Sequence, residues 1–442
     1  MLKTVRNAFK IKDIRNKLLF TFMVLIIVRL GSQLPVPGVN QAVIANWLQN
    51  NFGSGLSFLD SFTGGSFTRM SLFALGIGPY ITSSIIMQLL TIAIPKLEEM
   101  QKDGESGRKK IAEISRYVTI GLSIIESVAM VIGFSGSGAL EGGLTLTNIV
   151  VITASFTAGS AILMWLGERI TEKGVGNGIS VILLINIVAN MPRDIFGLIE
   201  KFILGESVVK GVTAGIIIVA VILVSVVLII LLNAAQRKIA VQYAKKVQGR
   251  KMVGGQSSHI PLKVNTAGVI PVIFAVSIMQ FPIIIASFFG VQPARAYFWP
   301  KVLYMLNSQS WFSIKNGEFK YTAGVLIYMA LIVFFAYFYT SITFNPMEVA
   351  NNMKKQGGFI PGIRPGKPTT EYLNKVLNYI IFIGAIGLMI VAIIPIFFSG
   401  MFDAHVSFSG TSLIIVVSVV LETMKQVESQ MLVRHYKGFL ND

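Results

Sequence analysis

One stretch of this sequence, Val212-Thr-Ala-Gly-Ile-Ile-Ile-Val-Ala-Val-Ile-Leu-Val-Ser-Val-Val-Leu-Ile-Ile-Leu-Leu232, is 21 residues long and has no charged side chain. A helix needs about 20 mostly apolar residues to cross a bilayer, because lipid offers no hydrogen-bond partner to an exposed backbone group. The whole chain has the same character, with 53% hydrophobic residues, 13% charged residues and a mean hydropathy of +0.69. Nine further stretches of membrane-spanning character are predicted at Leu18–Leu34, Met70–Pro95, Val118–Phe134, Thr147–Leu166, Gly174–Met191, Ala267–Phe289, Thr322–Phe344, Val376–Phe398 and Gly410–Met424.

The positive charge lies almost entirely on one side of these spans. With the N-terminus in the cytoplasm, the segments on that side hold 29 Lys and Arg residues, the opposite side holds 8, and Arg29 lies inside the first span. Because Lys and Arg resist translocation, the basic side is cytoplasmic. We therefore expect a multi-pass protein of the cytoplasmic (inner) membrane with both termini in the cytoplasm.

The ten spans divide five and five around a polar segment. Residues 1–191 form an N-terminal half, residues 192–210 an external hinge segment, and residues 211–442 a C-terminal half. Because five is odd, the second half starts on the opposite face, so the predicted fold is an all-α membrane protein of two inverted five-helix halves.

Enzymatic chemistry is not indicated. The chain has no cysteine, which excludes disulfides and thiolate metal sites. Its three histidines fall in separate segments, and no nucleophile lies near a base in the sequence. We expect no catalytic residues, no metal and no cofactor.

Glycine and proline mark two unusual segments. In the second span, Pro79 follows Gly76 and Gly78 and predicts a kinked or broken helix. Before the fifth span, Gly174-Val-Gly-Asn-Gly178 suits tight turns. A phosphate-cradling loop is the alternative for this second segment, although the strand and the following lysine that such a loop requires are absent.

Residues 56–69, between the first two spans, are too short and polar to cross the membrane but too apolar for an ordinary loop. A short helix tucked into the protein from outside is one interpretation. A helix lying at the outer interface of the membrane is the other.

Two cytoplasmic loops are longer than the connections between spans require. Residues 233–266 carry seven basic residues and no acidic one, and weak alternation on both sides of Gly254-Gly255 predicts a protruding hairpin. Residues 345–375 contain Gly357-Gly-Phe-Ile-Pro-Gly-Ile-Arg-Pro-Gly366, which predicts a rigid tip presenting Arg364. Basic loops often serve only as topology signals, but these favour docking to an acidic partner.

Together these segments resemble the SecY family of protein-conducting channels over essentially the whole chain. The resemblance rests on five motifs in the family's order: Leu34-Pro-Val-Pro-Gly-Val39, Gly76-Ile-Gly-Pro-Tyr-Ile81 with Ile85-Ile-Met-Gln88, Trp165-Leu-Gly-Glu168 with Gly174-Val-Gly-Asn-Gly-Ile-Ser180, Pro261-Leu-Lys-Val-Asn265 and Gly362-Ile-Arg-Pro-Gly366. Leu183 departs mildly from the more usual Ile, and Glu126 stands where an uncharged residue is expected.

The resemblance implies an hourglass with an aliphatic ring at its waist. By motif position the pore ring is Ile77, Ile81, Ile179, Leu183, Ile273 and Ile415. A plug caps the ring from outside, and its implied residues are Leu56, Phe58, Leu59, Phe62, Gly64 and Gly65. The second and third spans would face the seventh and eighth across a lateral gate.

The same resemblance implies the partners. Arg237, Lys238, Lys245 and Arg364 would contact the SecA motor ATPase or the ribosome. Small membrane subunits resembling SecE and SecG are also implied, together with the unfolded preprotein, its signal sequence and the lipid bilayer.

The expected function is a channel that translocates unfolded secretory polypeptides and releases membrane segments laterally into lipid. An aliphatic ring dewets a narrow pore and excludes ions, yet makes no directed bond that would select one peptide sequence. The alternative is a secondary transporter of a small solute, suggested by the broken second span and by Glu126 within the third. A transporter would need polar groups converging at mid-depth, where the implied ring is aliphatic.

Overall fold

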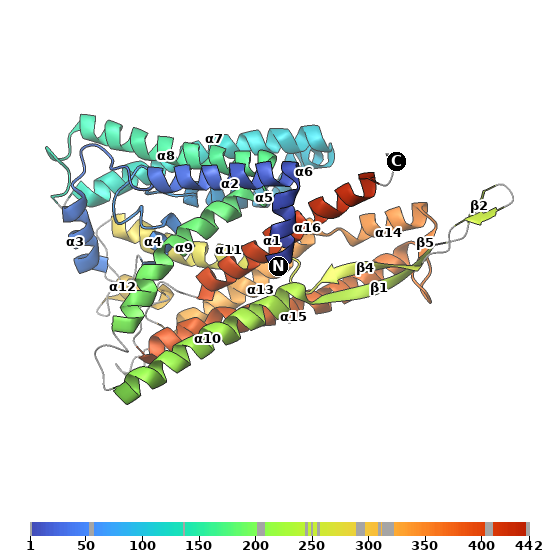
Figure 1. Ribbon diagram of the computed structural model, residues 1–442. Coiled ribbons are helices and arrows are strands. Elements are labelled where there is room, and N and C mark those ends of the chain that lie inside the picture. Colours follow the sequence, from blue (N-terminus) through green and yellow to red (C-terminus); the bar gives the residue numbers. More distant parts are fainter. Residues whose placement is uncertain are drawn as a thin grey trace.

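The structure is a computed structural model (Figure 1). It describes residues 2–52, 57–135, 138–200, 208–243, 246–248, 251–253, 257–288, 297–307, 311, 322–402 and 410–438. All ten predicted spans fall on helices: α2 (Lys12–Gly31), α5 (Gly78–Ala93), α7 (Glu105–Phe134), α8 (Leu146–Lys173), α9 (Gly178–Ile199), α10 (Val208–Ala234), α11 (Ile270–Phe288), α13 (Ala323–Thr343), α15 (Lys367–Phe402) and α16 (Gly410–Gly438).

Within the described residues, six helices are long and apolar enough to cross a bilayer, and a bent pair would make a seventh. That pair is α5 and α6 (Pro95–Lys102), which meet at an angle of 101°. Ile94 is extended, and Pro95 begins the new helix because a proline is tolerated in a first turn.

Smaller elements gather at the two ends of the helical bundle (Figure 1). The short helices α3 (Gln41–Phe52), α4 (Ser57–Thr63) and α12 (Phe298–Leu306) lie toward one end, at the left of the view. Helix α1 (Leu2–Lys10), helix α14 (Pro346–Lys355) and the strands lie toward the other end.

The expectation that the second span begins at Met70 is wrong, because its helix begins only at Gly78. The backbone before it pairs instead with the segment that follows α2: Leu72 N donates to Leu34 O at 2.9 Å, and Ser71 bridges Pro35. Gly76 has a φ of +58°, which a glycine adopts at no steric cost. Pro79 therefore starts this helix rather than kinking it.

The hairpin predicted within residues 233–266 is confirmed. Strand β1 (Gln236–Tyr243) pairs antiparallel with β4 (Ser257–Lys263), and the short pair β2 (Lys246–Gln248) and β3 (Lys251–Val253) continues it outward. Strand β5 (Gly358–Phe359), from the second long loop, pairs with β1 through Gln242 and Tyr243. The two loops predicted separately therefore form one structural unit.

The polar segment between the two halves is more helical than its composition suggests. Helix α9 continues through Pro192 to Ile199, and α10 begins at Val208. Residues 201–207 of the predicted hinge segment lie outside the described residues. The division of the chain into residues 1–191 and 211–442 stays a prediction.

The core joins helices from both parts of the chain. Its largest cluster packs Val272, Phe274 and Met279 of α11 against residues of α13, α15 and α16, and it also takes in Ile85 of α5. Helix α7 contacts α11, and α16 contacts both α2 and α9. The boundary between the two predicted halves is thus a packed, mostly apolar surface.

Candidate functional site

The six predicted waist residues come from α5, α9, α11 and α16, with Ile77 capping the N-terminus of α5. Ile81 N donates to Ile77 O at 3.0 Å, so these two residues stack one turn apart. Three of the six side chains are buried, with 2% exposure for Ile77, 4% for Leu183 and 1% for Ile415. The other three, Ile81, Ile179 and Ile273, are half-buried.

The apolar clusters bring most of these residues together. Ile77, Ile81 and Ile179 belong to one cluster with α2 and α8. Ile273 and Ile415 belong to another with residues of α9, and Ile81 and Ile273 both pack on the main core. Leu183 lies one turn after Ile179 on α9. The candidate waist is therefore aliphatic and built from both parts of the chain.

The segment predicted to cap the waist folds as a short helix followed by a tight turn. Helix α4 packs on α9, and Phe62 joins the cluster that contains Ile273 and Ile415. Asp60, Ser61 and Ser66 are buried. Leu56 lies outside the described residues, as do the side chains of Phe58 and Leu59. Of the two interpretations, the tucked-in helix is the correct one.

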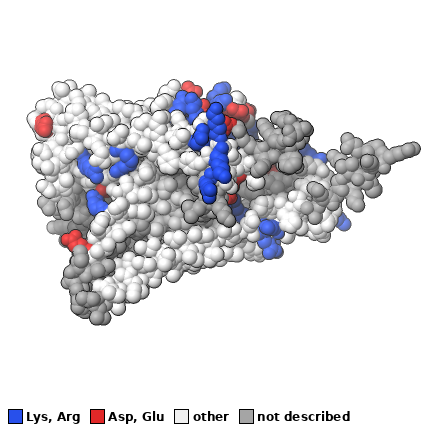
Figure 2. Space-filling view, in the orientation of Figure 1, with Lys and Arg blue, Asp and Glu red and all other residues white. Residues whose placement is uncertain are grey.

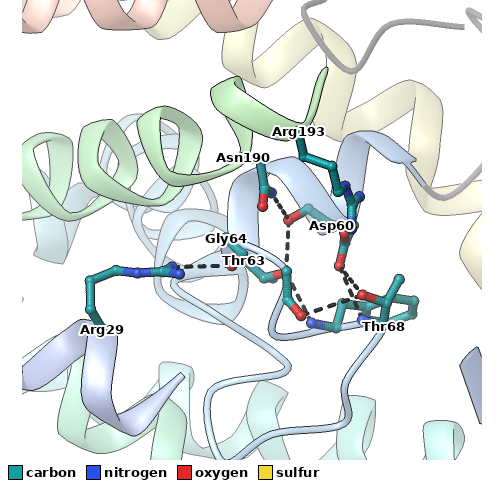
Figure 3. Close-up of polar contacts among 9 residues, drawn as sticks. Arg29, Asp60, Thr63, Gly64, Thr68, Asn190 and Arg193 are labelled. Carbon is teal, nitrogen blue, oxygen red and sulfur yellow. Dashed lines mark hydrogen bonds and ion pairs between the residues drawn. The ribbon is translucent and has the colours of Figure 1, made fainter. Parts of the chain in front are cut away.

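Three side chains from spans hold this segment by its backbone, and two of them, Arg29 and Asn190, are labelled in Figure 3. Arg29 Nη1 of α2 donates to Gly64 O at 3.1 Å. On α9, Asn186 Nδ2 donates to Phe62 O at 3.1 Å and Asn190 Nδ2 donates to Asp60 O at 3.0 Å. We call these three residues the latch. Since they bind carbonyls at the C-terminal end of α4, the cation Arg29 also lies where a helix dipole favours it.

Gly64 fits a position that a larger residue cannot occupy. Its φ is +68°, and an added Cβ would lie 2.6 Å from Arg29 Nη1 and 3.0 Å from Asn186 Oδ1. Gly65, with a φ of +83°, completes the turn. The paired glycines thus let the latch approach the backbone closely.

Asp60 closes the turn from within. Its Oδ1 accepts hydrogen bonds from Thr68 N at 3.0 Å and Thr68 Oγ1 at 2.8 Å, and its Oδ2 lies 3.5 Å from Arg193 Nη2 of α9 (Figure 3). Sequence reasoning did not single out Asn186, Asn190 or Asp60. The available signal was a pair of asparagines four residues apart in an otherwise apolar span.

The predicted docking residues lie at the opposite end of the protein. Arg237 and Lys238 are exposed on β1, and Arg364 is exposed on the turn after β5. The turn is braced by Thr369 Oγ1, which donates to Arg364 O at 2.8 Å. Both loops pack on one shared apolar core, which contains Ile239, Leu262, Met353, Ile360 and Leu373. Lys245 lies outside the described residues.

The glycine-rich turn before α9 is packed rather than open, so the phosphate-cradle alternative is wrong. Gly174, Val175, Gly176 and Gly178 are buried. Thr21 Oγ1 of α2 accepts from Val175 N at 3.1 Å, and an added Cβ on Gly178 would meet Gly167 O at 1.9 Å. The turn lets α2, α8, α9 and α16 approach one another.

Comparison with known protein families shows to which family the chain belongs. The family model described as SecY matches residues 71–424. The chain belongs to the SecY family. Two similar curated proteins are named protein translocase subunit SecY: one from Halalkalibacterium halodurans, 43% identical, and one from Bacillus subtilis, 42% identical, each covering all of both chains.

Solved structures show the same fold. One described as a protein-conducting channel aligns with a TM-score of 0.65 at 19% identity, covering 94% of this chain and 92% of that one. Sec61 in the canine ribosome–channel complex from the endoplasmic reticulum aligns with a TM-score of 0.61 at 18% identity and the same coverage.

The chain is therefore a multi-pass channel subunit for protein translocation and not an enzyme. The alternative of a small-solute transporter is wrong, because the full-length relatives of this SecY protein are translocase subunits. Glu126, which had suggested a transporter, lies on α7 beside the buried Ser123 and Ser127.

Proposed function

We propose that this chain conducts unfolded secretory polypeptides across the cytoplasmic membrane through the aliphatic waist, and that α4 with its turn is the plug of the closed channel. The observation that carries the proposal is a waist lined by isoleucines of both halves, with Phe62 of the plug packed beside Ile273 and Ile415. Such a surface excludes water and ions while binding no particular peptide sequence.

The latch supports the assignment of the plug. All three latch residues bind main-chain oxygens, so no side chain of the plug takes part in these bonds. These three hydrogen bonds all come from one half of the chain, from α2 and α9. A polypeptide entering the waist would need to break these few bonds rather than unfold a core.

A lateral exit is supported by the packing between the two halves. Helices α5 and α7 would face α11 and α13, and the contacts of α7 with α11 and of Ile85 with the α11 cluster lie along this boundary. A segment leaving here would enter lipid, where each central Leu or Ile gains about 0.3–0.6 kcal/mol.

The energy for transport would come from a partner that docks on the cytoplasmic unit formed by the two basic loops. Arg237, Lys238 and Arg364 suit acidic surfaces, including those of SecA and ribosomal RNA. Two structural neighbours are ribosome-bound channels, Sec61 and the yeast Ssh1 complex. Small subunits resembling SecE and SecG would complete the assembly.

The charge distribution supports cytoplasmic termini. In Figure 2, Lys and Arg gather mainly toward the end of the molecule that holds the N-terminus and the hairpin. The surfaces of the helices between that end and the opposite end are largely uncharged. A smaller basic group overlies the region of α4 and the outer part of α9 (Figure 2). Arg193 of α9 is a basic residue that contacts the plug, through Asp60.

Reconstitution tests the proposal directly. The chain with its small subunits is placed in vesicles with a motor ATPase and a secretory preprotein, and transport is scored by protection of the preprotein from added protease. Protection is expected only with ATP and only for a preprotein that carries its signal sequence. Protection of a folded, signal-free protein, or none with any motor, would refute the proposal.

A further inference from the structure

Helix α12 begins with an exposed aromatic group that belongs to neither the waist, the plug nor the basic loops. Tyr297, Phe298 and Trp299 are consecutive and expose 76%, 74% and 70% of their surfaces, and the rings of Phe298 and Trp299 meet edge to face at 5.6 Å. Successive residues of a helix point about 100° apart. A helix end lying flat on the protein would bury at least one of three such residues. This end therefore projects from the protein.

The other end of α12 is fixed to a membrane helix. Leu303 is buried, and Met305 O accepts a hydrogen bond from Trp311 Nε1 at 2.7 Å. The same oxygen would lie 1.9 Å from a Cβ added to Gly324, the second residue of α13. Direct contact between backbones thus sets the level of α12 against the first turn of α13.

With α13 spanning the bilayer, that level would lie at the boundary of the hydrocarbon layer. Helix α13 has 21 residues, which makes it about 31 Å long and matches a hydrocarbon core of about 30 Å. The aromatic end lies within roughly 12 Å of this boundary along α12, at 1.5 Å per residue. The neighbouring helices also carry exposed apolar side chains, including Phe281 and Ile285 of α11 and Leu326 of α13.

We propose that Tyr297, Phe298 and Trp299 form an interfacial anchor that inserts into the headgroup region of the bilayer beside α11 and α13. Tyrosine and tryptophan are enriched at this depth because their rings are apolar and their polar groups reach water or headgroups. Lys301, exposed two residues after Trp299, can extend its ammonium toward lipid phosphates. The anchor ties the ends of two helices of the candidate lateral gate to the membrane surface.

The anchor requires only that α13 spans the membrane, so it can fail while the proposed function stands. Because the chain has no cysteine, a single Trp299→Cys variant carries one nitroxide label. The full-length labelled protein is reconstituted in phosphatidylcholine and phosphatidylglycerol vesicles. Collision with oxygen, which concentrates in lipid, and with a water-soluble nickel chelate then reports the depth of the label.

Two matched positions calibrate the measurement: Ile278→Cys on the lipid-facing side of α11 and Ser258→Cys on the exposed hairpin. The oxygen-to-nickel ratio at 299 should fall between those two, and Tyr297→Cys and Phe298→Cys should give the same depth. A ratio at all three positions equal to that of Ser258 would mean that the aromatics stand in water. Low collision with both reagents would mean that protein covers them. Either result overturns the anchor.

Discussion

Arg29, Asn186 and Asn190 hold the proposed plug by hydrogen bonds to main-chain oxygens, and the energy of these bonds can be estimated. A neutral hydrogen bond contributes about 1 kcal/mol net, and one with a charged donor about 1.5–3 kcal/mol. The latch is then worth roughly 4 kcal/mol, which would bias the plug several hundredfold toward its seat. That is strong enough to seal a resting channel and weak enough for an arriving signal sequence to offset.

Replacing Asn190 with Leu should loosen the plug. The change removes one of three donors to Asp60 O, which still accepts from Gly65 N at 2.9 Å and from Thr63 Oγ1 at 3.2 Å. The closed state should therefore lose about 1 kcal/mol, or about fivefold in its population relative to the open state. Resting ion conductance in planar bilayers should rise accordingly. Asn148→Leu is the control, because Asn148 also donates to two backbone carbonyls but lies outside the plug. Equal conductance in the two variants would show that Asn190 does not hold the plug.

Gly178 makes a different kind of contribution, since it lets two helices touch. A Cβ there would lie 1.9 Å from Gly167 O, and overpacking of this kind costs about 1–3 kcal/mol or more. Gly178→Ala should therefore lower the thermal unfolding midpoint in detergent. Gly121→Ala should leave the midpoint unchanged or raise it, because nothing lies within 4 Å of that position. Matching midpoints for the two variants would contradict close packing at the turn.

At the scale of elements, the length of each apolar run predicted the helices but not where each one begins. Met70 is predicted as the start of a span because the chain from Leu72 onward is mostly apolar. In the structure, Met70 O instead accepts from Val36 N at 3.3 Å, and Ser71 bridges Pro35. The backbone of residues 70–72 forms its hydrogen bonds with residues 34–36, so it does not need helical hydrogen bonds. The hydropathy of the sequence does not reveal such a pairing with another segment.

The two basic loops act as one element because β1 pairs with both β4 and β5. Reversing Arg237 and Lys238 to Glu should weaken binding of the ribosome at low salt and flatten its salt dependence, since each lost phosphate contact removes about one released counterion. Lys109→Glu with Lys110→Glu is the control, with the same net charge on exposed residues of α7 outside the loops. Binding curves over a salt series provide the measurement. If both double variants lose affinity equally, only the overall charge matters.

Arg364 belongs to the same unit but stands on the turn, where a guanidinium gives bidentate geometry that an ammonium cannot. Arg364→Glu should abolish motor-driven protection of a preprotein while membrane insertion and thermal stability stay normal. Arg364→Lys should retain part of the activity, because it keeps the charge and loses the fork. Full transport by the Glu variant would remove Arg364 from the docking surface.

For the whole molecule, the sequence sufficed to predict the membrane class and the hairpin, while the aliphatic waist stays a prediction from the family motifs. The sequence did not suffice for the latch. Asn190 and Asp60 are 130 residues apart, and Arg29 and Gly64 are 35 apart. An isolated arginine in a span, such as Arg29, indicates a functional role in general. Its hydrogen-bond acceptor, however, is a main-chain oxygen, and every residue has one. The pattern of side chains in the sequence therefore could not identify Gly64 as the partner of Arg29.

The waist itself yields the sharpest test, because a channel and a packed core respond oppositely to polarity. Ile81 and Ile273 are half-buried residues from different halves, so serine at both positions places hydroxyls in the constriction without emptying the core. Water and ions should then enter, giving a resting leak in planar bilayers while preprotein transport continues, since no side chain there makes a required bond. Ile332→Ser with Leu388→Ser is the control, because both side chains are fully buried in the main cluster. That variant should lose stability and gain no conductance. A folded Ile81→Ser, Ile273→Ser protein that stays electrically tight would mean that these residues do not line the pore.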